Sequence, residues 1–196
     1  MYYTPIMKRL ALLFALALAP SVIGCSAAVD DPTEEGVTDE DPVTLATDTK
    51  IKNAVLKTSN GLSFMSESDH DFVWVRSTMV ATGPGNAAFI HRAFNKVTDG
   101  DPMADKPLSK LKSETVSFES WASRYVPVQG EDADNYAYHQ KMTAMLAVLR
   151  TNLKNPVVIR LGRVSGNNLV GAISVYIVGT LPSGKIGGLF TVSVET

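Results

Sequence analysis

Cysteine is almost absent from this sequence, and the motifs of several common enzyme classes are absent altogether. The chain of 196 residues has one cysteine, Cys25. It can therefore form neither a disulfide within one chain nor a cysteine-based metal site or thiol redox pair. There is also no Walker-type phosphate loop, no Gly-x-Ser-x-Gly nucleophile elbow and no His-Glu-x-x-His helix. Most of the common enzyme motifs are thus excluded.

A long apolar run is lacking as well. The unbroken apolar stretch near the start, residues 10–19, has ten residues, too few to cross a bilayer as a helix. It follows a short basic start that ends in Lys8 and Arg9, and small residues come after it at 20–25. This layout is typical of a secretory signal. We therefore expect residues 1–24 to be a signal peptide.

The one cysteine lies where such a signal would be cut. Val22-Ile23-Gly24-Cys25 resembles the bacterial lipobox, in which the signal is cleaved before the cysteine and the thiol carries a diacylglyceryl group. Several acyl chains together give stable membrane anchoring. The resemblance implies a lipoprotein of the bacterial cell envelope, with lipidation at Cys25, and Ser26 in place of Asp favours the outer membrane. The alternative is an ordinary signal with an incidental cysteine.

Acidic residues are concentrated directly after this point. Residues 26–50 contain eight acidic residues and one basic residue, whereas residues 51–196 contain 12 acidic and 15 basic residues, a net charge of +3. Residues 26–45 have too few large apolar side chains to pack. We predict that 25–45 is a lipidated cysteine with a flexible tether, with a reach of about 25 Å, and that 46–196 is one domain.

Hydrophobic periodicity predicts the elements of this domain. An apolar stripe with lysines opposite it predicts a helix over 46–59, and alternation predicts a strand over 71–81. The turn cluster at 83–86 predicts a hairpin that continues into a second strand near 87–93. Residues 99–112 are polar and predict a loop.

The second half of the chain has the clearest periods. A short helix is expected within 118–125, and apolar residues at three- and four-residue intervals predict the main helix over 131–154. Alternation then predicts strands around the ranges 157–161, 173–177 and 190–194, with a turn at 182–184. Two main helices with a mostly antiparallel sheet of four to five strands predict an α+β fold, a layered α/β sandwich.

Three segments follow one another in a recognisable order. They are Asn60-Gly61-Leu62-Ser63-Phe64-Met65-Ser66-Glu67-Ser68-Asp69; Asn152-Leu153-Lys154-Asn155-Pro156 with Arg160-Leu161-Gly162; and Tyr176-Ile177-Val178-Gly179-Thr180 with Pro182, Gly184 and the closing Val194-Glu195-Thr196. In this order they are similar to segments of the nuclease A inhibitor family, whose members block a sugar-nonspecific metal-dependent nuclease. The resemblance covers about 46–196. The segment 163–172 is longer than its counterpart in the family, and Gln129-Gly130 stand where the family has a tryptophan.

The resemblance implies that Glu67 and Thr196 are the inhibitory pair that reaches the nuclease's catalytic Mg²⁺, with Ser66, Ser68 and Glu195 beside them. Mg²⁺ prefers hard oxygen ligands, and a glutamate together with a terminal α-carboxylate offers two anionic oxygen groups. Proteins that imitate DNA over a large surface are acidic. The net charge of +3 therefore favours a small contact at the metal, a local plug, over imitation of a whole DNA segment. From the residues alone, Glu67 could equally be an ordinary loop carboxylate and Thr196 simply the end of a strand. No cofactor, no metal site of its own and no direct nucleic-acid binding are expected.

Two other classes of function compete with inhibition. Asp69-His70-Asp71 is the one local cluster suited to acid/base chemistry, with His91 and His139 as distant candidates. Adjacent residues on a loop point in different directions, whereas a catalytic histidine needs an orienting carboxylate and a pocket. We therefore expect no enzyme. The more serious alternative is a lipoprotein interaction module that keeps the fold but binds another envelope protein.

Overall fold

The computed structural model describes residues 48–196, apart from 68, 81–82, 84–85 and 95–97. The predicted signal peptide 1–24, Cys25 and the predicted tether lie outside the described residues. In chain order the elements are α1 Asp48–Ser59, β1 Ser63–Phe64, β2 His70–Asp71, β3 Val73–Val80, α2 Ala87–Phe94, η1 Leu108–Lys110, β4 Lys112–Ser117, α3 Phe118–Ala122, η2 Ser123–Tyr125, α4 Ala133–Asn152, β5 Lys154–Ser165, β6 Asn168–Thr180 and β7 Lys185–Glu195.

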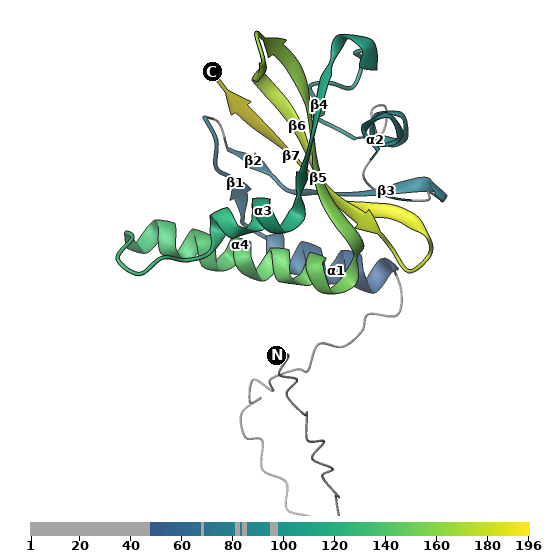
Figure 1. The fold of residues 1–196 in the computed structure, drawn as a ribbon. Coiled ribbons are helices and arrows are strands. Elements are labelled where there is room, and N and C mark those ends of the chain that lie inside the picture. The colour runs from purple at the N-terminus through teal and green to yellow at the C-terminus, as the bar shows by residue number, and fades with distance from the viewer. Residues whose placement is uncertain (1–47, 68, 81–82, 84–85, 95–97) are drawn as a thin grey trace, which may run out of the picture. The chain divides into compact units, whose positions relative to one another are not determined.

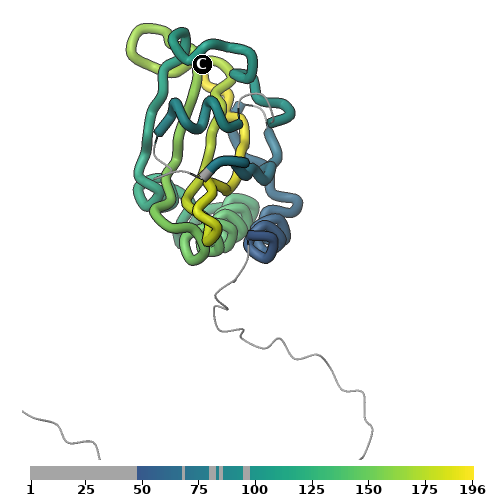
Figure 2. Tube along the Cα trace, turned by 90° about the vertical axis from the view of Figure 1, so that its right-hand side faces the viewer, coloured from purple at the N-terminus to yellow at the C-terminus, as the bar shows by residue number. Residues whose placement is uncertain are grey.

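A five-stranded sheet organises the domain. Its strand order is β3-β7-β6-β5-β4, and each neighbouring pair is antiparallel. The short strands β1 and β2 form a separate antiparallel pair. Figure 1 shows α1 and α4 lying side by side, and the turned view in Figure 2 shows the same arrangement. The predicted α+β class with a mostly antiparallel sheet is confirmed.

The sheet separates two apolar clusters, because successive residues of a strand point to opposite faces. In β6, Val175 and Ile177 belong to the cluster beneath α1 and α4. The residues between and after them, Tyr176 and Val178, belong to the cluster on the other face, together with Phe94 of α2. Both faces of β6 are therefore buried, as expected for the middle strand of a sheet with helices on both sides.

The main helix has the expected position, with bounds Ala133–Asn152 against the predicted 131–154. Its apolar stripe is buried, and Met142, Met145 and Leu149 have no exposed surface. Asp132 caps the helix, because its carboxylate accepts a hydrogen bond from the backbone N–H of Asn135 at 2.9 Å. The helix at 48–59 and the strands at 157–161, 173–177 and 190–194 are likewise confirmed.

The expected strand at 87–93, and with it the hairpin through 83–86, is wrong. Residues 87–94 form the helix α2. Its start is fixed by Asn86, whose side-chain oxygen accepts hydrogen bonds from the backbone N–H groups of Ala88 at 2.9 Å and Phe89 at 3.3 Å. Ile90 and Phe94, four residues apart on one side of the helix, are fully buried. Residues 84–85 of the expected turn lie outside the described residues.

One strand of the five-stranded sheet was not predicted. β4 begins at Lys112, the last residue of the expected loop, and pairs with β5 from Lys112 opposite Gly162 to Ser117 opposite Val157. Five of its six residues are Lys, Ser, Glu or Thr, so it has little apolar alternation. Its partner strand, not its own composition, fixes its conformation.

In the described part of the chain, none of the helices is long and apolar enough to span a membrane.

Asp48 ties the start of α1 to two strands. Its carboxylate accepts hydrogen bonds from the Ser183 hydroxyl at 2.6 Å, in the turn between β6 and β7, and from Nε of Arg76 in β3 at 2.8 Å. Burial alone would raise the pKa of Asp48, but the hydrogen bonds from Ser183 and Arg76 outweigh it and lower the pKa. The ionised form of Asp48 therefore stabilises the folded domain.

We expect Asp48→Asn to lower the free energy of unfolding at pH 7 by about 1–2 kcal/mol, because hydrogen bonds to a charged acceptor are lost. Since the folded-state pKa is lowered, this stabilisation is present at neutral pH and disappears as the pH falls through that pKa. Urea unfolding of both proteins between pH 7 and pH 3 measures it. Glu119→Gln, which breaks a well exposed ion pair with Arg150, is the control and should change stability little. An equal loss for Asp48→Asn at both ends of this pH range would contradict the assignment.

Candidate functional site

The loop that carries Glu67, called the reactive loop below, is the tip of the small β1–β2 hairpin. After α1 the chain turns at Gly61, whose φ of 66° favours glycine. Ser63 then pairs with Asp71, and Phe64 pairs with His70. The loop between the two strands carries Glu67 and is exposed at that residue. The hairpin therefore presents Glu67 at its end.

Aromatic packing fixes the base of this hairpin. Phe64 is 7% exposed. Its ring lies 6.1 Å from that of Phe72, 6.0 Å from that of Trp121 and 6.5 Å from that of Tyr125, measured between centroids. The next residue, Met65, donates its backbone N–H to the Tyr138 hydroxyl at 3.3 Å. The contacts of Phe64 and Met65 thus fix the position at which the loop leaves the apolar core.

The far end of β7 lies against this hairpin. β3 pairs with β7 as far as Val73 opposite Phe190. Beyond that point the hairpin supplies the contacts: Thr191 donates its hydroxyl to the backbone carbonyl of His70 at 3.2 Å, and Val194 donates its backbone N–H to the Ser66 hydroxyl oxygen at 3.1 Å. Figure 1 shows β2 beside β7, with the C-terminus at the same end of the sheet.

Glu67 and Thr196 are in direct contact. The Thr196 hydroxyl donates a hydrogen bond to Oε1 of Glu67 at 2.6 Å, although 129 positions separate the two residues. Both are exposed. The structure therefore brings the two residues of the expected pair together on the surface, where a partner can reach them.

The other expected site residues have different positions. The Ser66 hydroxyl oxygen faces β7 and accepts the hydrogen bond from Val194. The Glu195 carboxylate accepts hydrogen bonds from the Ser193 hydroxyl at 3.1 Å and from the guanidinium of Arg160 in β5. Ser68 and Cys25 lie outside the described residues. The contact with Arg160 was not predicted, because it depends on the register of the sheet.

The histidines expected as alternative catalytic candidates lie on different elements. His70 is in β2 beside Asp71, whose carboxylate accepts a hydrogen bond from the Ser63 hydroxyl at 2.9 Å. Nε2 of His91, in α2, lies 2.7 Å from the Lys106 carbonyl oxygen. His139, in α4, contacts Glu131 at 2.9 Å. Among the described residues, no group of three or more His, Cys, Asp or Glu side chains is arranged to hold a metal ion.

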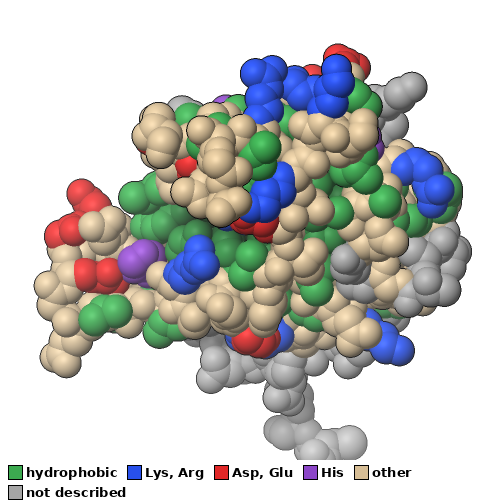
Figure 3. Space-filling view, turned by 45° about the horizontal axis from the view of Figure 1, so that its top comes forward, with side chains coloured by type: hydrophobic (Ala, Val, Ile, Leu, Met, Phe, Trp, Pro, Cys, Tyr) green, Lys and Arg blue, Asp and Glu red, His purple; other side chains and the backbone are tan. Residues whose placement is uncertain are grey.

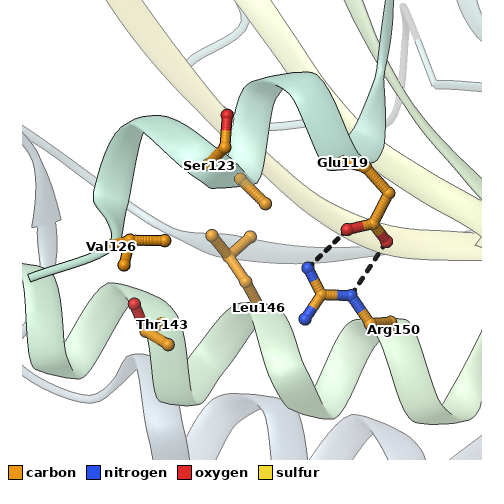
Figure 4. A pocket seen from close by; sticks show the side chains of 7 residues that line it. Glu119, Ser123, Val126, Thr143, Leu146 and Arg150 are labelled. Atoms are coloured by element: carbon orange, nitrogen blue, oxygen red, sulfur yellow. Dashed lines mark hydrogen bonds and ion pairs between the residues drawn. The ribbon is translucent and has the colours of Figure 1, made fainter.

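A pocket of about 260 Å³ lies between α3, η2 and α4, away from Glu67 (Figure 4). Two of its lining residues neutralise each other: Arg150 donates two hydrogen bonds to the Glu119 carboxylate, at 2.8 and 2.6 Å. The hydrogen bond from Arg150 holds the pKa of Glu119 below its ordinary value. The rest of the lining includes Val126 and Leu146. This combination provides no acid/base pair for catalysis.

A second pocket, of about 310 Å³, borders the reactive loop. Met65 and Asp69 line it from the loop, and Asp134, Tyr138 and Lys141 line it from α4. Met65 is 51% exposed at its rim. Burial raises the pKa of Tyr138, so its hydroxyl remains protonated near neutral pH. The surface next to Glu67 is therefore a shallow hollow with mixed charge.

Comparison with models of known protein families gives a match. The model of a family described as "Nuclease A inhibitor-like protein" matches residues 49–196, which include every helix and strand from β1 onward and nearly all of α1. Among curated proteins, no match to this chain is found.

We expect Ser66→Ala to loosen the end of β7. The Val194 N–H loses its acceptor, at a cost of about 1 kcal/mol, so its hydrogen exchange should become about fivefold faster. Exchange measured by NMR at single amides tests this. Ser63→Ala, the same change at the other end of the hairpin, is the control and should leave the Val194 rate unchanged. Equal exchange rates for Val194 in all three proteins would show that Ser66 does not hold the strand.

Proposed function

The chain belongs to the nuclease A inhibitor-like family, and on this premise we propose that its domain inhibits a sugar-nonspecific, Mg-dependent endonuclease by blocking the catalytic metal. Membership of this family implies an inhibitor rather than an enzyme. The partner is the nuclease itself, and the domain is not proposed to bind nucleic acid directly.

The observation that carries this proposal is the contact between Glu67 and Thr196 at 2.6 Å on the exposed surface. In the proposal, Glu67 supplies a side-chain carboxylate and Thr196 supplies its terminal α-carboxylate. Two anionic oxygen groups on residues in contact would resemble the oxygens of a phosphodiester, and Mg²⁺ binds hard oxygen ligands of this kind. The metal is the nuclease's, and the inhibitor occupies the positions that substrate phosphate would take.

The charge distribution supports a small contact at the nuclease's metal, and not one that covers the whole DNA-binding groove. A protein that covered the whole basic groove of a nuclease would need a broadly acidic face. Residues 51–196 instead carry a net charge of +3. Figure 3 shows a face on which acidic and basic side chains are interspersed among hydrophobic and uncharged surface, not one continuous acidic surface. We therefore propose a small anionic contact centred on the pair.

We also propose that the domain works in the bacterial cell envelope. The Val22-Ile23-Gly24-Cys25 sequence supports lipidation at Cys25, with anchoring in the outer membrane favoured by Ser26. Residues 26–45 would then serve as a spacer that lets the domain meet secreted nucleases. Deleting them should leave inhibition nearly unchanged, because a flexible spacer makes no fixed contact.

Substitutions in the pair test the inhibitory mechanism. Glu67→Gln keeps an acceptor for Thr196 but removes the charge, and deletion of Thr196 removes one carboxylate. Losing one partner of a desolvated charged contact costs about 2–5 kcal/mol, so each change should raise the inhibition constant at least about tenfold. Thr196→Val, which keeps the terminal carboxylate, should have a smaller effect than the deletion.

The assay measures DNA and RNA cleavage by a purified nuclease of this class from the same organism, with Glu119→Gln as a control for an exposed carboxylate elsewhere. Unchanged inhibition in Glu67→Gln and in the deletion would refute the metal plug. Failure of the intact domain to bind any such nuclease would favour a lipoprotein module with another envelope partner.

Lipidation at Cys25 has its own test. The protein purified from membranes should have the mass of the chain from Cys25 onward plus its acyl groups. Cys25→Ser should abolish both the added mass and the membrane association. An unmodified soluble product that begins at another residue would rule the anchor out.

A further inference from the structure

Arg160 bridges two carboxylates at the end of the sheet that carries the pair. Its strand position is fixed on both sides, since it pairs with Glu114 of β4 and with Val175 of β6. One guanidinium nitrogen donates to Oε2 of Glu114 at 2.8 Å, and the other donates to the Glu195 carboxylate. The Arg160 side chain is 20% exposed, compared with 43% for Glu195. A partly buried cation, paired with two carboxylates, thus contacts the last residue of β7.

The end of β7 needs such a restraint. Terminal residues fray unless other groups hold them. On one side Val194 and Glu195 pair with Ala172 and Gly171 of β6. On the other side the contact is the Ser66 hydroxyl, which accepts from the Val194 N–H. Glu195 is the last strand residue before Thr196. The contact of Arg160 with the Glu195 side chain therefore also restrains Thr196, which contacts Glu67.

We propose that Arg160 is a positioning residue of the inhibitory site: by holding Glu195 it keeps Thr196 beside Glu67 and so determines how tightly the domain binds its nuclease. The effect on affinity rests on the proposed function, whereas the restraint on the chain end does not. Arg160 itself makes no contact with the metal in this proposal.

The geometry requires arginine at this position. Two nitrogens of one planar guanidinium serve two carboxylates from different strands, and a lysine ammonium is a single point charge without that fork. Glu114 is itself held by Lys112 at 3.4 Å. The chain Lys112, Glu114, Arg160 and Glu195 therefore runs across the sheet from its β4 edge to β7.

The first experiment needs no nuclease. Carboxypeptidase releases Thr196 from a frayed chain end faster than from a restrained one. In Arg160→Gln the release rate should rise about fivefold or more, as expected for the loss of an interaction of about 1 kcal/mol. Arg160→Lys, which keeps the charge, should lie between this variant and the unaltered protein. Arg150→Gln breaks a comparable pair with Glu119 and should leave the rate unchanged.

The second experiment separates positioning from general stability. Inhibition constants are measured for Arg160→Gln in the full chain and in the chain that lacks Thr196, at a temperature where thermal unfolding shows both to be folded. Loss of a residue that acts through Thr196 should weaken inhibition about fivefold or more in the full chain and have no further effect in the truncated one. Equal weakening in both chains would show a merely structural role and overturn the proposal.

The two experiments test different claims, so one claim can be refuted while the other stands. Unchanged carboxypeptidase release in Arg160→Gln overturns the positioning role, whether or not the domain inhibits a nuclease. Faster release combined with no inhibition by the unaltered protein supports the restraint and refutes the proposed function instead.

Discussion

The antiparallel pairing of β7 with β6 is the interaction on which the site depends. It runs from Thr180 opposite Ile186 to Gly171 opposite Glu195, so the strand is held along its whole length on that side. β3 leaves β7 at Phe190, and this early departure frees the other side of the last five strand residues. The β1–β2 hairpin occupies that position, which brings a loop from the first third of the domain to the end of its last strand.

Elements that bury large apolar side chains at a regular period could be predicted from the sequence. Met142, Met145 and Leu149 mark α4, and alternation marks β5, β6 and β7, because each pattern repeats over several turns or residue pairs. Residues 87–93 were predicted as a strand, since so short an apolar segment does not distinguish the two periods. The decisive feature was the capping oxygen of Asn86, a single polar group.

The polar strand β4 could not be found from its own residues. Lys112 to Ser117 contain one large apolar residue, Val116. Their conformation comes from six successive pairs with β5, and strand propensity reflects such neighbours more than it reflects the backbone. The same strand supplies Glu114 to Arg160. An element that sequence patterns do not reveal is therefore part of what holds the end of β7.

The candidate pair was predicted through resemblance and not through physics alone. No local pattern links Glu67 to a residue 129 positions away, because their contact follows from the place where β3 ends and from the register of β7. The supporting contacts of Ser66 and Arg160 depend on the same register. Sequence motifs thus indicated which residues meet, while only the fold explains why they meet.

The central position of β7 also determines when the domain can form during synthesis. β7 is the last strand to be made, yet it separates β3 from β6 in the sheet. While the ribosome still holds this strand, β3 has no neighbouring strand in the sheet, and the hairpin with Glu67 lacks its hydrogen bonds to Thr191 and Val194. Sheet pairings between such distant segments form late. Completion of the sheet therefore has to wait for the last strand, and a chain cut short before β7 would lack the strand whose end lies beside Glu67.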